Sequence, residues 1–108
     1  PNAAYADGDE LALGALRFRV LHTPGHAPGH VVLHGAGVLL AGDLLFRGSI
    51  GRTDLPMADP RAMTRSLVRV AALPPETVVY PGHGEATTIG AERRTNPFLN
   101  GGARALGG

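Results

Sequence analysis

The sequence His22-Thr-Pro-Gly-His-Ala-Pro-Gly-His30 places three imidazoles close together and separates them with two Pro-Gly pairs. Proline fixes its own φ, and glycine adopts backbone angles that are closed to other residues, so this segment cannot continue as helix or strand. The apolar runs on either side, 16–21 and 31–33, are typical of strands. We therefore predict a rigid loop between two strands, which directs its imidazoles in fixed directions and is well suited to hold a metal ion.

The composition limits the classes of function. The chain has 108 residues, no cysteine and a formal net charge of +1. This length is enough for one ordinary domain, and the lack of cysteine excludes disulfides, thiolate metal sites and cysteine nucleophiles. A net charge this small provides no strong field to attract nucleic acid or an acidic membrane, and no apolar run reaches transmembrane length. We expect a cytoplasmic protein with neither nucleic acid nor a membrane as partner.

Apolar runs bounded by turn residues predict strands at 11–13, 16–22, 30–34, 38–41 and 77–80. Because the third and fourth runs are apolar at consecutive positions, we expect both faces of their sheet to be covered. Asp59-Pro60 predicts a helix start, since Asp caps a helix and Pro suits its first turn; this helix should end near residue 72. A second helix is expected from Thr88 to about residue 95. Strands followed by helix, strand and helix indicate an α/β fold, with residues 101–108 as a glycine-rich tail.

Three side chains of metal-ligand type occupy equivalent places in this pattern. His26, Asp43 and His83 each stand in a glycine-containing turn that follows a predicted strand. Open α/β sheets place their sites at strand ends, so we expect these side chains to meet at one edge of the sheet. Two imidazoles and one carboxylate suit zinc, iron or manganese, and three protein ligands leave room for water or substrate.

Each of these residues also has a purely structural interpretation. His26 could be a polar loop residue, Asp43 could form an Asx turn, and His83 could be a turn residue. Their joint occurrence at strand ends favours a metal site. His22 and His30 flank the loop and could compete as ligands; we interpret them as residues that hydrogen-bond the loop backbone and support the ligands.

Short motifs follow one another in an order that resembles the metallo-β-lactamase superfamily, and most closely its glyoxalase II-like branch, the hydroxyacylglutathione hydrolases. The resemblance extends from about residue 7 to residue 99. The motifs that carry it are His22-Thr-Pro-Gly-His26-Ala-Pro-Gly-His30, Ala41-Gly-Asp43, Gly48-Ser-Ile-Gly-Arg-Thr-Asp54, Tyr80-Pro-Gly-His-Gly84, Glu92-Arg93 and Asn96-Pro-Phe98.

The resemblance implies a four-layer αββα sandwich with a two-metal site, usually zinc and sometimes iron or manganese. The position of His26 then binds the first metal, that of Asp43 bridges both, and that of His83 binds the second. A hydroxide held between the ions at Asp43 attacks a thioester carbonyl in such enzymes. Arg52 and Asp54, in the loop after Asp43, are expected to brace the site through a salt bridge or hydrogen bonds.

One departure from the family pattern is as informative as the agreement. The motif His-x-His-x-Asp-His, which lies in the first half of such enzymes and supplies most of their metal ligands, does not occur in this chain. Residues 1–100 therefore resemble the second, C-terminal half of the sandwich. We expect the chain alone to bind one metal ion or none and to be inactive. Half a sandwich also exposes an apolar sheet face, so we expect pairing with the missing half or self-association.

Two other interpretations stay open. The persulfide dioxygenase branch of the same fold shares the segment Gly51-Arg-Thr-Asp54, binds one iron, and does not use the position of His83 as a ligand. The segment Pro81-Gly-His-Gly84 resembles the two-metal version, which ranks this interpretation second. The third interpretation is a truncated half-domain without catalytic activity.

Overall fold

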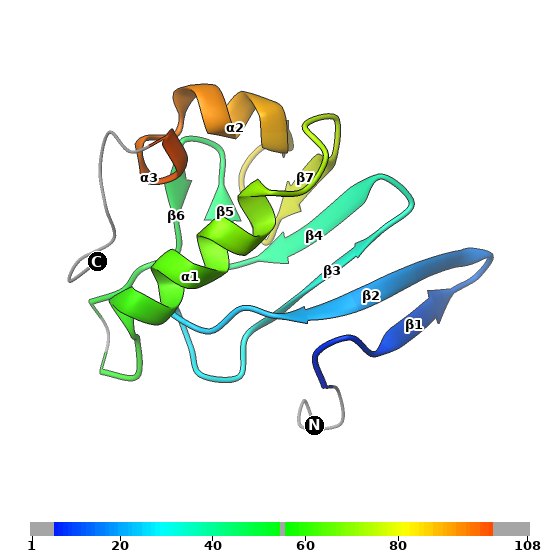
Figure 1. The fold of residues 1–108 in the computed structure, drawn as a ribbon, viewed down its shortest axis with the longest axis horizontal. Helices are drawn as coiled ribbons and strands as arrows, with labels where there is room; N and C mark the ends of the chain where they lie inside the picture. The colour runs from blue at the N-terminus through cyan, green and yellow to red at the C-terminus, as the bar shows by residue number, and fades with distance from the viewer. Residues whose placement is uncertain (1–5, 55, 101–108) are drawn as a thin grey trace.

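The fold is a mixed α/β structure built on a six-stranded sheet (Figure 1). The computed structural model describes residues 6–54 and 56–100. The elements are β1 (Glu10–Leu13), β2 (Leu16–His22), β3 (Val31–Gly35), β4 (Val38–Gly42), β5 (Leu45–Phe46), β6 (Ser49–Ile50), α1 (Pro60–Ala71), β7 (Val78–Pro81), β8 (Thr87–Thr88), α2 (Ile89–Thr95) and α3 (Pro97–Asn100). All five predicted strands and both predicted helices are confirmed. The sequence patterns missed β5, β6, β8 and α3, and the predicted tail lies outside the described residues.

The order of strands brings three loops to the same edge of the sheet. The strands are arranged β1-β2-β3-β4-β7-β8, and all neighbours are antiparallel except β4 and β7, which are parallel. Strands β2, β4 and β7 consequently run in the same direction. The loops that follow them carry His26, Asp43 and His83, so these three loops begin at one edge of the sheet.

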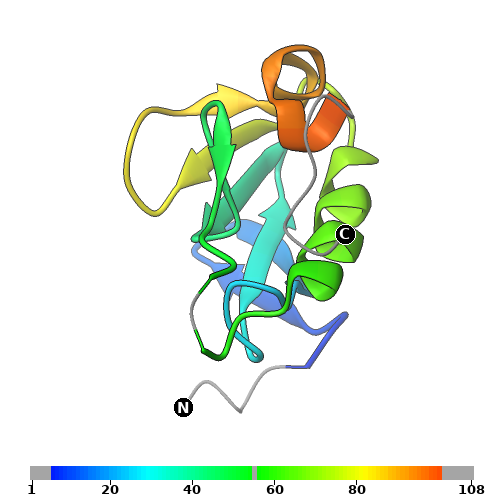
Figure 2. The same cartoon turned by 90° about the vertical axis from the view of Figure 1, so that its left-hand side faces the viewer.

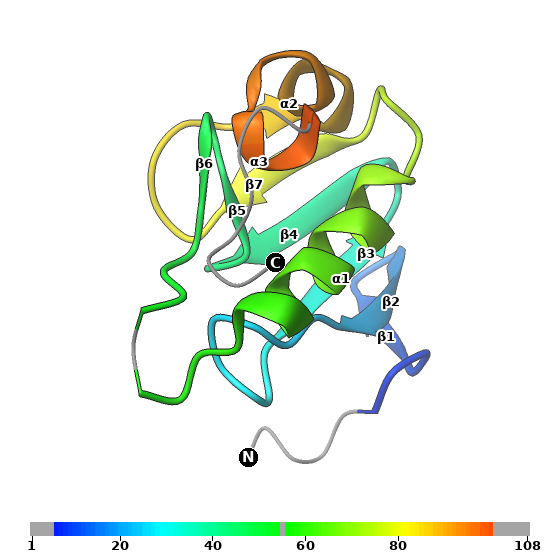
Figure 3. The same cartoon turned by 60° about the vertical axis from the view of Figure 1, so that its left-hand side comes forward.

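Helix α1 covers one face of this sheet (Figure 3). Ala62, Met63, Leu67 and Val70 recur at helical spacing and are buried, while the arginines at 61, 65 and 69 are exposed. The core between helix and sheet is formed by Leu21, Val32, Leu39, Ala41, Leu44, Leu45, Met63, Leu67, Val70, Val79 and Ile89. This core fixes the strand ends from which the candidate site is built.

The opposite face of the sheet is apolar and only partly covered. Strand alternation and register place on it Leu11, Leu13, Leu16, Phe18, Val20, Val31, Leu33, Val38, Leu40, Val78 and Tyr80. Phe18 and Val20 are buried, but Leu16 is 51% and Tyr80 50% exposed. Figure 2 shows α1 along one side of the sheet, and none of the helices in the described ranges lies over the other side. The expectation that both faces are covered is therefore wrong: β3 buries only Val32, and β4 buries only Leu39 and Ala41.

The start of α1 offers a test of the cap. Asp59 has extended backbone angles, and its Oδ1 accepts hydrogen bonds from the amides of Arg61 and Ala62, both at 3.1 Å. Replacing Asp59 with alanine leaves these amides without their partner, so we expect the free energy of unfolding to fall by about 1 kcal/mol. Urea denaturation measures this change. Asp59→Asn retains an accepting oxygen and should recover most of the loss; an equal loss in both variants would contradict the capping role.

Candidate metal centre

The histidine loop between β2 and β3 is held by hydrogen bonds at both ends. The amide of Thr23 donates to the carbonyl of His30 (2.9 Å), and Nε2 of His22 lies 2.9 Å from the carbonyl of Pro28. Since a carbonyl only accepts, His22 donates here. The hydroxyl of Ser66 on α1 donates to the carbonyl of Pro24 at 2.7 Å. His22 thus bonds the loop backbone rather than facing the other candidate ligands.

His26 and Asp43 face each other across the sheet edge. Nε2 of His26 lies 3.8 Å from Oδ2 of Asp43, which is too long for a hydrogen bond. Nδ1 of His26 lies 3.0 Å from the carbonyl of Arg52, so Nδ1 carries a proton and donates it to this oxygen. In this tautomer Nε2 carries no proton, and its lone pair is on the nitrogen that lies beside the Asp43 carboxylate. Two ligands at about 2.0–2.2 Å from one ion can be this far apart.

The side chain of His30 bonds the backbone at Asp43. Its Nε2 accepts a hydrogen bond from the backbone amide of Asp43 at 3.1 Å, and its Nδ1 lies 3.1 Å from the hydroxyl of Thr23. Because Nε2 accepts, Nδ1 is the protonated nitrogen and Thr23 is its acceptor. Burial lowers the pKa of His30 below the ordinary 6.5, the nearby Asp43 raises it, and His26 lowers it further. His30 therefore positions the backbone at Asp43 in its neutral form.

This arrangement predicts a loss of stability in mild acid. A histidine with a depressed folded pKa contributes stability fully above its unfolded pKa near 6.5, and that contribution is lost as pH falls from there through the folded pKa. Protonation also places a hydrogen on Nε2, which breaks the bond from the Asp43 amide. We expect urea midpoints to fall between about pH 8 and about pH 5, and His30→Gln to flatten this slope. His34, whose pKa is lowered by burial and by Arg19, titrates in the same sense, so His34→Gln is the matched comparison. An unchanged slope in His30→Gln would refute the assignment.

The third predicted ligand lies in the adjoining loop. The amide of Gly82 donates to the carbonyl of Gly42 at 2.8 Å, which joins this loop to the Asp43 turn. The imidazole of His83 stacks on the ring of Phe46, with 4.5 Å between ring centroids. Within residues 6–54 and 56–100, no three His, Cys, Asp or Glu side chains are grouped so as to hold a metal ion. The structure thus brings His26 and Asp43 together and places His83 against an aromatic neighbour.

Arg52 and Asp54 pair with each other at the surface. Nε and Nη2 of Arg52 donate to the two carboxylate oxygens of Asp54 at 3.0 and 3.1 Å, and this guanidinium holds the pKa of Asp54 below its usual range. Exposed pairs of this kind contribute little to stability. The support that His26 receives comes from the backbone carbonyl of Arg52. Sequence reasoning did not identify this contact or that of Thr23, since neither depends on a characteristic side-chain spacing.

The backbone of Gly51 passes close to the backbone of Asp43. A Cβ atom on this residue would lie 1.9 Å from the carbonyl oxygen of Asp43 and 3.3 Å from Nδ1 of His26. Only glycine allows the chain to pass here, which explains why a glycine precedes Arg52.

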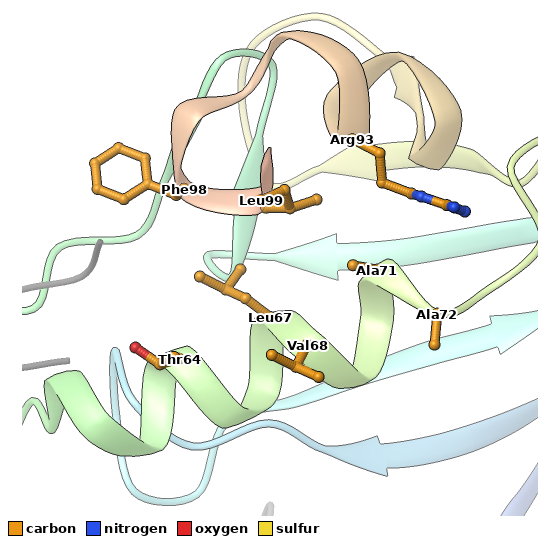
Figure 4. A pocket seen from close by; sticks show the side chains of 8 residues that line it. All are labelled: Thr64, Leu67, Val68, Ala71, Ala72, Arg93, Phe98 and Leu99. Atoms are coloured by element: carbon orange, nitrogen blue, oxygen red, sulfur yellow. The ribbon is translucent and has the colours of Figure 1, made fainter. Parts of the chain in front are cut away.

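Two hollows accompany these elements. One, of about 420 Å³, adjoins the His83 loop and is lined by Phe46, Arg47, Ser49, His83, Gly84 and Glu85; Arg47 and Glu85 form an ion pair across it. The other, of about 410 Å³, lies between α1 and the α2–α3 segment (Figure 4). Its lining is Thr64, Leu67, Val68, Ala71, Ala72, Arg93, Phe98 and Leu99, which includes none of the candidate ligands.

Comparison with known proteins identifies the family. The family model described as the metallo-beta-lactamase superfamily matches residues 5–83. This chain belongs to the metallo-β-lactamase superfamily. It is 43% identical over 97 residues to the hydroxyacylglutathione hydrolase GloC of Haemophilus influenzae, a match that covers 87% of this chain and 46% of that protein.

Solved structures agree with this assignment. The chain resembles TTHA1623 in a di-iron-bound form (TM-score 0.79, 55% identity, covering 88% of this chain and 47% of that one). It also resembles ETHE1 from Myxococcus xanthus (TM-score 0.83, 38% identity, covering 90% and 45%). The chain spans about half the length of the proteins it matches, so it contains part of a metallo-β-lactamase fold. Of the helices in the described ranges, none has the length and apolar character needed to span a membrane.

Proposed function

We propose that this chain contributes part of the metal site of a thioester hydrolase of the hydroxyacylglutathione hydrolase type. The observation that carries the proposal is the pair formed by His26 and Asp43, whose ligand atoms face each other at 3.8 Å. Both are oriented by backbone contacts: the Arg52 carbonyl holds His26, and His30 holds the amide of Asp43. Orientation of ligands by such supporting groups is typical of metal sites.

The donor set fits a metal ion of intermediate hardness. An unprotonated imidazole nitrogen and a carboxylate, with no thiolate available, suit zinc, iron or manganese; we propose zinc as the native ion. His26 and Asp43 would hold the first ion, and His83 would join as a ligand to a second after turning away from Phe46. Such ions, when bound, polarise a substrate carbonyl and activate water for attack.

The residues of this chain would orient the thioester beside these ligands. The hollow of about 420 Å³ next to the His83 loop would take the acyl portion. Its charged pair, Arg47 and Glu85, would face polar groups of the substrate. We propose that the Asp43 carboxylate accepts a hydrogen bond from the O–H of the attacking water, because its Oδ2 lies 3.8 Å from Nε2 of His26.

The open face of the sheet supports a requirement for a second polypeptide segment. Its half-buried and exposed apolar side chains, among them Leu13, Leu16 and Tyr80, would gain from burial. The matched relatives are about twice as long as this chain, so we propose that the face packs against the half-domain that carries the His-x-His-x-Asp-His motif. A second copy of this chain on the same face is the alternative outcome.

Reconstitution tests this proposal. The chain is mixed with a polypeptide carrying the first half of the Haemophilus influenzae relative, then incubated with zinc and a lactoylglutathione-type thioester. We expect no turnover by either piece alone, a one-to-one complex by analytical ultracentrifugation, and release of free thiol by the mixture. Turnover by this chain alone that disappears in His26→Ala refutes the need for the missing half. A stable complex that binds zinc and releases no thiol refutes the hydrolase.

A second candidate function is favoured by one specific contact. The stacking of His83 on Phe46 leaves His26 and Asp43 as the facing pair, as expected for a site with one iron in the persulfide dioxygenase branch. Metal analysis of the reconstituted protein separates the two: one iron per complex with oxygen uptake supports the dioxygenase, whereas two ions per complex with thiol release supports the hydrolase.

A further inference from the structure

Helix α2 carries a buried carboxylate, and no ion pair with it is formed by the residues that the structure describes. Glu92 is 1% exposed, and its oxygens accept hydrogen bonds from the amide of Gly48 (2.8 Å), the hydroxyl of Thr87 (2.7 Å) and the side-chain amide of Asn96 (2.9 Å). Burying a carboxylate is costly unless such bonds replace its water. Because all three donors are neutral and none belongs to the candidate ligands, Glu92 acts by holding other parts of the chain.

Asn96 extends the same network to a second group of backbone atoms. It is fully buried, and its Nδ2 donates to the carbonyl of Ser49 at 3.1 Å and lies 3.4 Å from that of Phe46. With Glu92 bound to Gly48, the two side chains contact three residues of the β5–β6 hairpin. This hairpin has strands of only two residues each, and an isolated hairpin is marginally stable at best. The contacts from Glu92 and Asn96 therefore add to the burial of Leu45 in stabilising the hairpin.

The hairpin leads directly to the atoms that orient His26. Strand β5 begins two residues after Asp43, and β6 ends immediately before Gly51. The amide of Gly51 donates to the carbonyl of Leu44 at 3.1 Å, which closes the base of the hairpin. The next carbonyl, that of Arg52, accepts the Nδ1 proton of His26. The position of this carbonyl thus depends on how firmly the hairpin is held.

We propose that Glu92 and Asn96 are positioning residues for the metal centre. They fix the β5–β6 hairpin so that the Arg52 carbonyl selects the Nδ1-protonated tautomer of His26 and directs its Nε2 toward Asp43. This inference rests on the proposed function only because it takes His26 as a metal ligand. The experiment below reads the tautomer itself, so it can succeed even if the hydrolase assignment fails.

The test is ¹⁵N NMR of the histidine rings and of backbone amides in the 108-residue chain. In the unchanged chain and in Glu92→Gln, which keeps an accepting oxygen for Gly48, we expect one tautomer of His26 and a protected Gly51 amide. In Glu92→Ala we expect mixed tautomers, at least tenfold faster exchange of the Gly51 amide, and zinc affinity lower by about 10–100-fold. Thr87→Val removes one bond to Glu92 and should shift the same signals to a smaller extent, so it replaces Glu92→Ala if that variant does not fold.

A matched control separates positioning from a general loss of stability. Val70→Ala removes core contacts on α1 but none of the hydrogen bonds from Glu92 and Asn96 to the hairpin, and it should leave the His26 tautomer and the Gly51 exchange rate unchanged. The proposal is overturned if folded Glu92→Ala or Thr87→Val shows the same His26 tautomer as the unchanged chain. It is also overturned if Val70→Ala disturbs His26 as much as Glu92→Ala does.

Discussion

Replacement of Gly25 by alanine is expected to lower the free energy of unfolding by about 3 kcal/mol or more. Gly25 has a φ of +144°, a backbone angle that residues with a side chain rarely adopt. Its carbonyl accepts a hydrogen bond from the amide of Asp59 at 2.6 Å. A Cβ atom here would lie 2.4 Å from Cα and 2.5 Å from Cβ of Met63. Met63 is fully buried on α1, so helix and loop would have to separate.

The same loop provides the matched control. Gly29 has no positive φ, and a Cβ atom on it would meet nothing within 4 Å. Gly29→Ala is therefore expected to change stability by no more than about 0.5 kcal/mol. Urea denaturation of both variants, with ¹⁵N spectra to show the state of His26, makes the comparison. If Gly25→Ala is as stable as Gly29→Ala, the close packing of the histidine loop on α1 is refuted.

The contrast between these two glycines shows what sequence patterns can predict. The two Pro-Gly pairs indicated a shaped loop, and the apolar runs placed the strands on either side correctly. Which glycine is indispensable depends on Met63, a residue far along the chain, and no local pattern contains that information. The same reason explains the missed strands β5, β6 and β8, because two residues are too few to show a period.

In the candidate site too, the sequence predicted some features and not others. The order of strands and glycine turns predicted that the side chains of His26, Asp43 and His83 meet at one sheet edge. The three loops do begin there, but of these side chains only His26 and Asp43 form a close pair in the described part of the chain. The stacking of His83 on Phe46 depends on the hairpin, which the sequence did not reveal. The backbone atoms that orient the ligands, the Arg52 carbonyl and the Asp43 amide, also lack a sequence signature, since every residue carries such groups.

Removal of the His26 imidazole should have the largest effect on activity. In the reconstituted protein, we expect His26→Ala to reduce kcat/KM for thioester hydrolysis by about 10³-fold, because a metal ion supplies several kcal/mol of transition-state stabilisation. The loss arises from the missing ligand and from the release of the Arg52 carbonyl that held it. Zinc binding by calorimetry should weaken in parallel, whereas the strands and α1, whose core does not include His26, should stay folded.

His34, a histidine outside the candidate site, provides the control for His26→Ala. It lies on β3, pairs in register with Arg19 and Leu39, and forms no part of the histidine loop. His34→Ala removes the same functional group from the strand that follows the histidine loop, so any general effect of losing an imidazole appears in both variants. We expect its hydrolysis and zinc affinity to stay within twofold of the unchanged protein. Equal activity of His26→Ala and His34→Ala would show that His26 is not a ligand. The orientation of His26 toward Asp43 would then be a feature of loop packing alone.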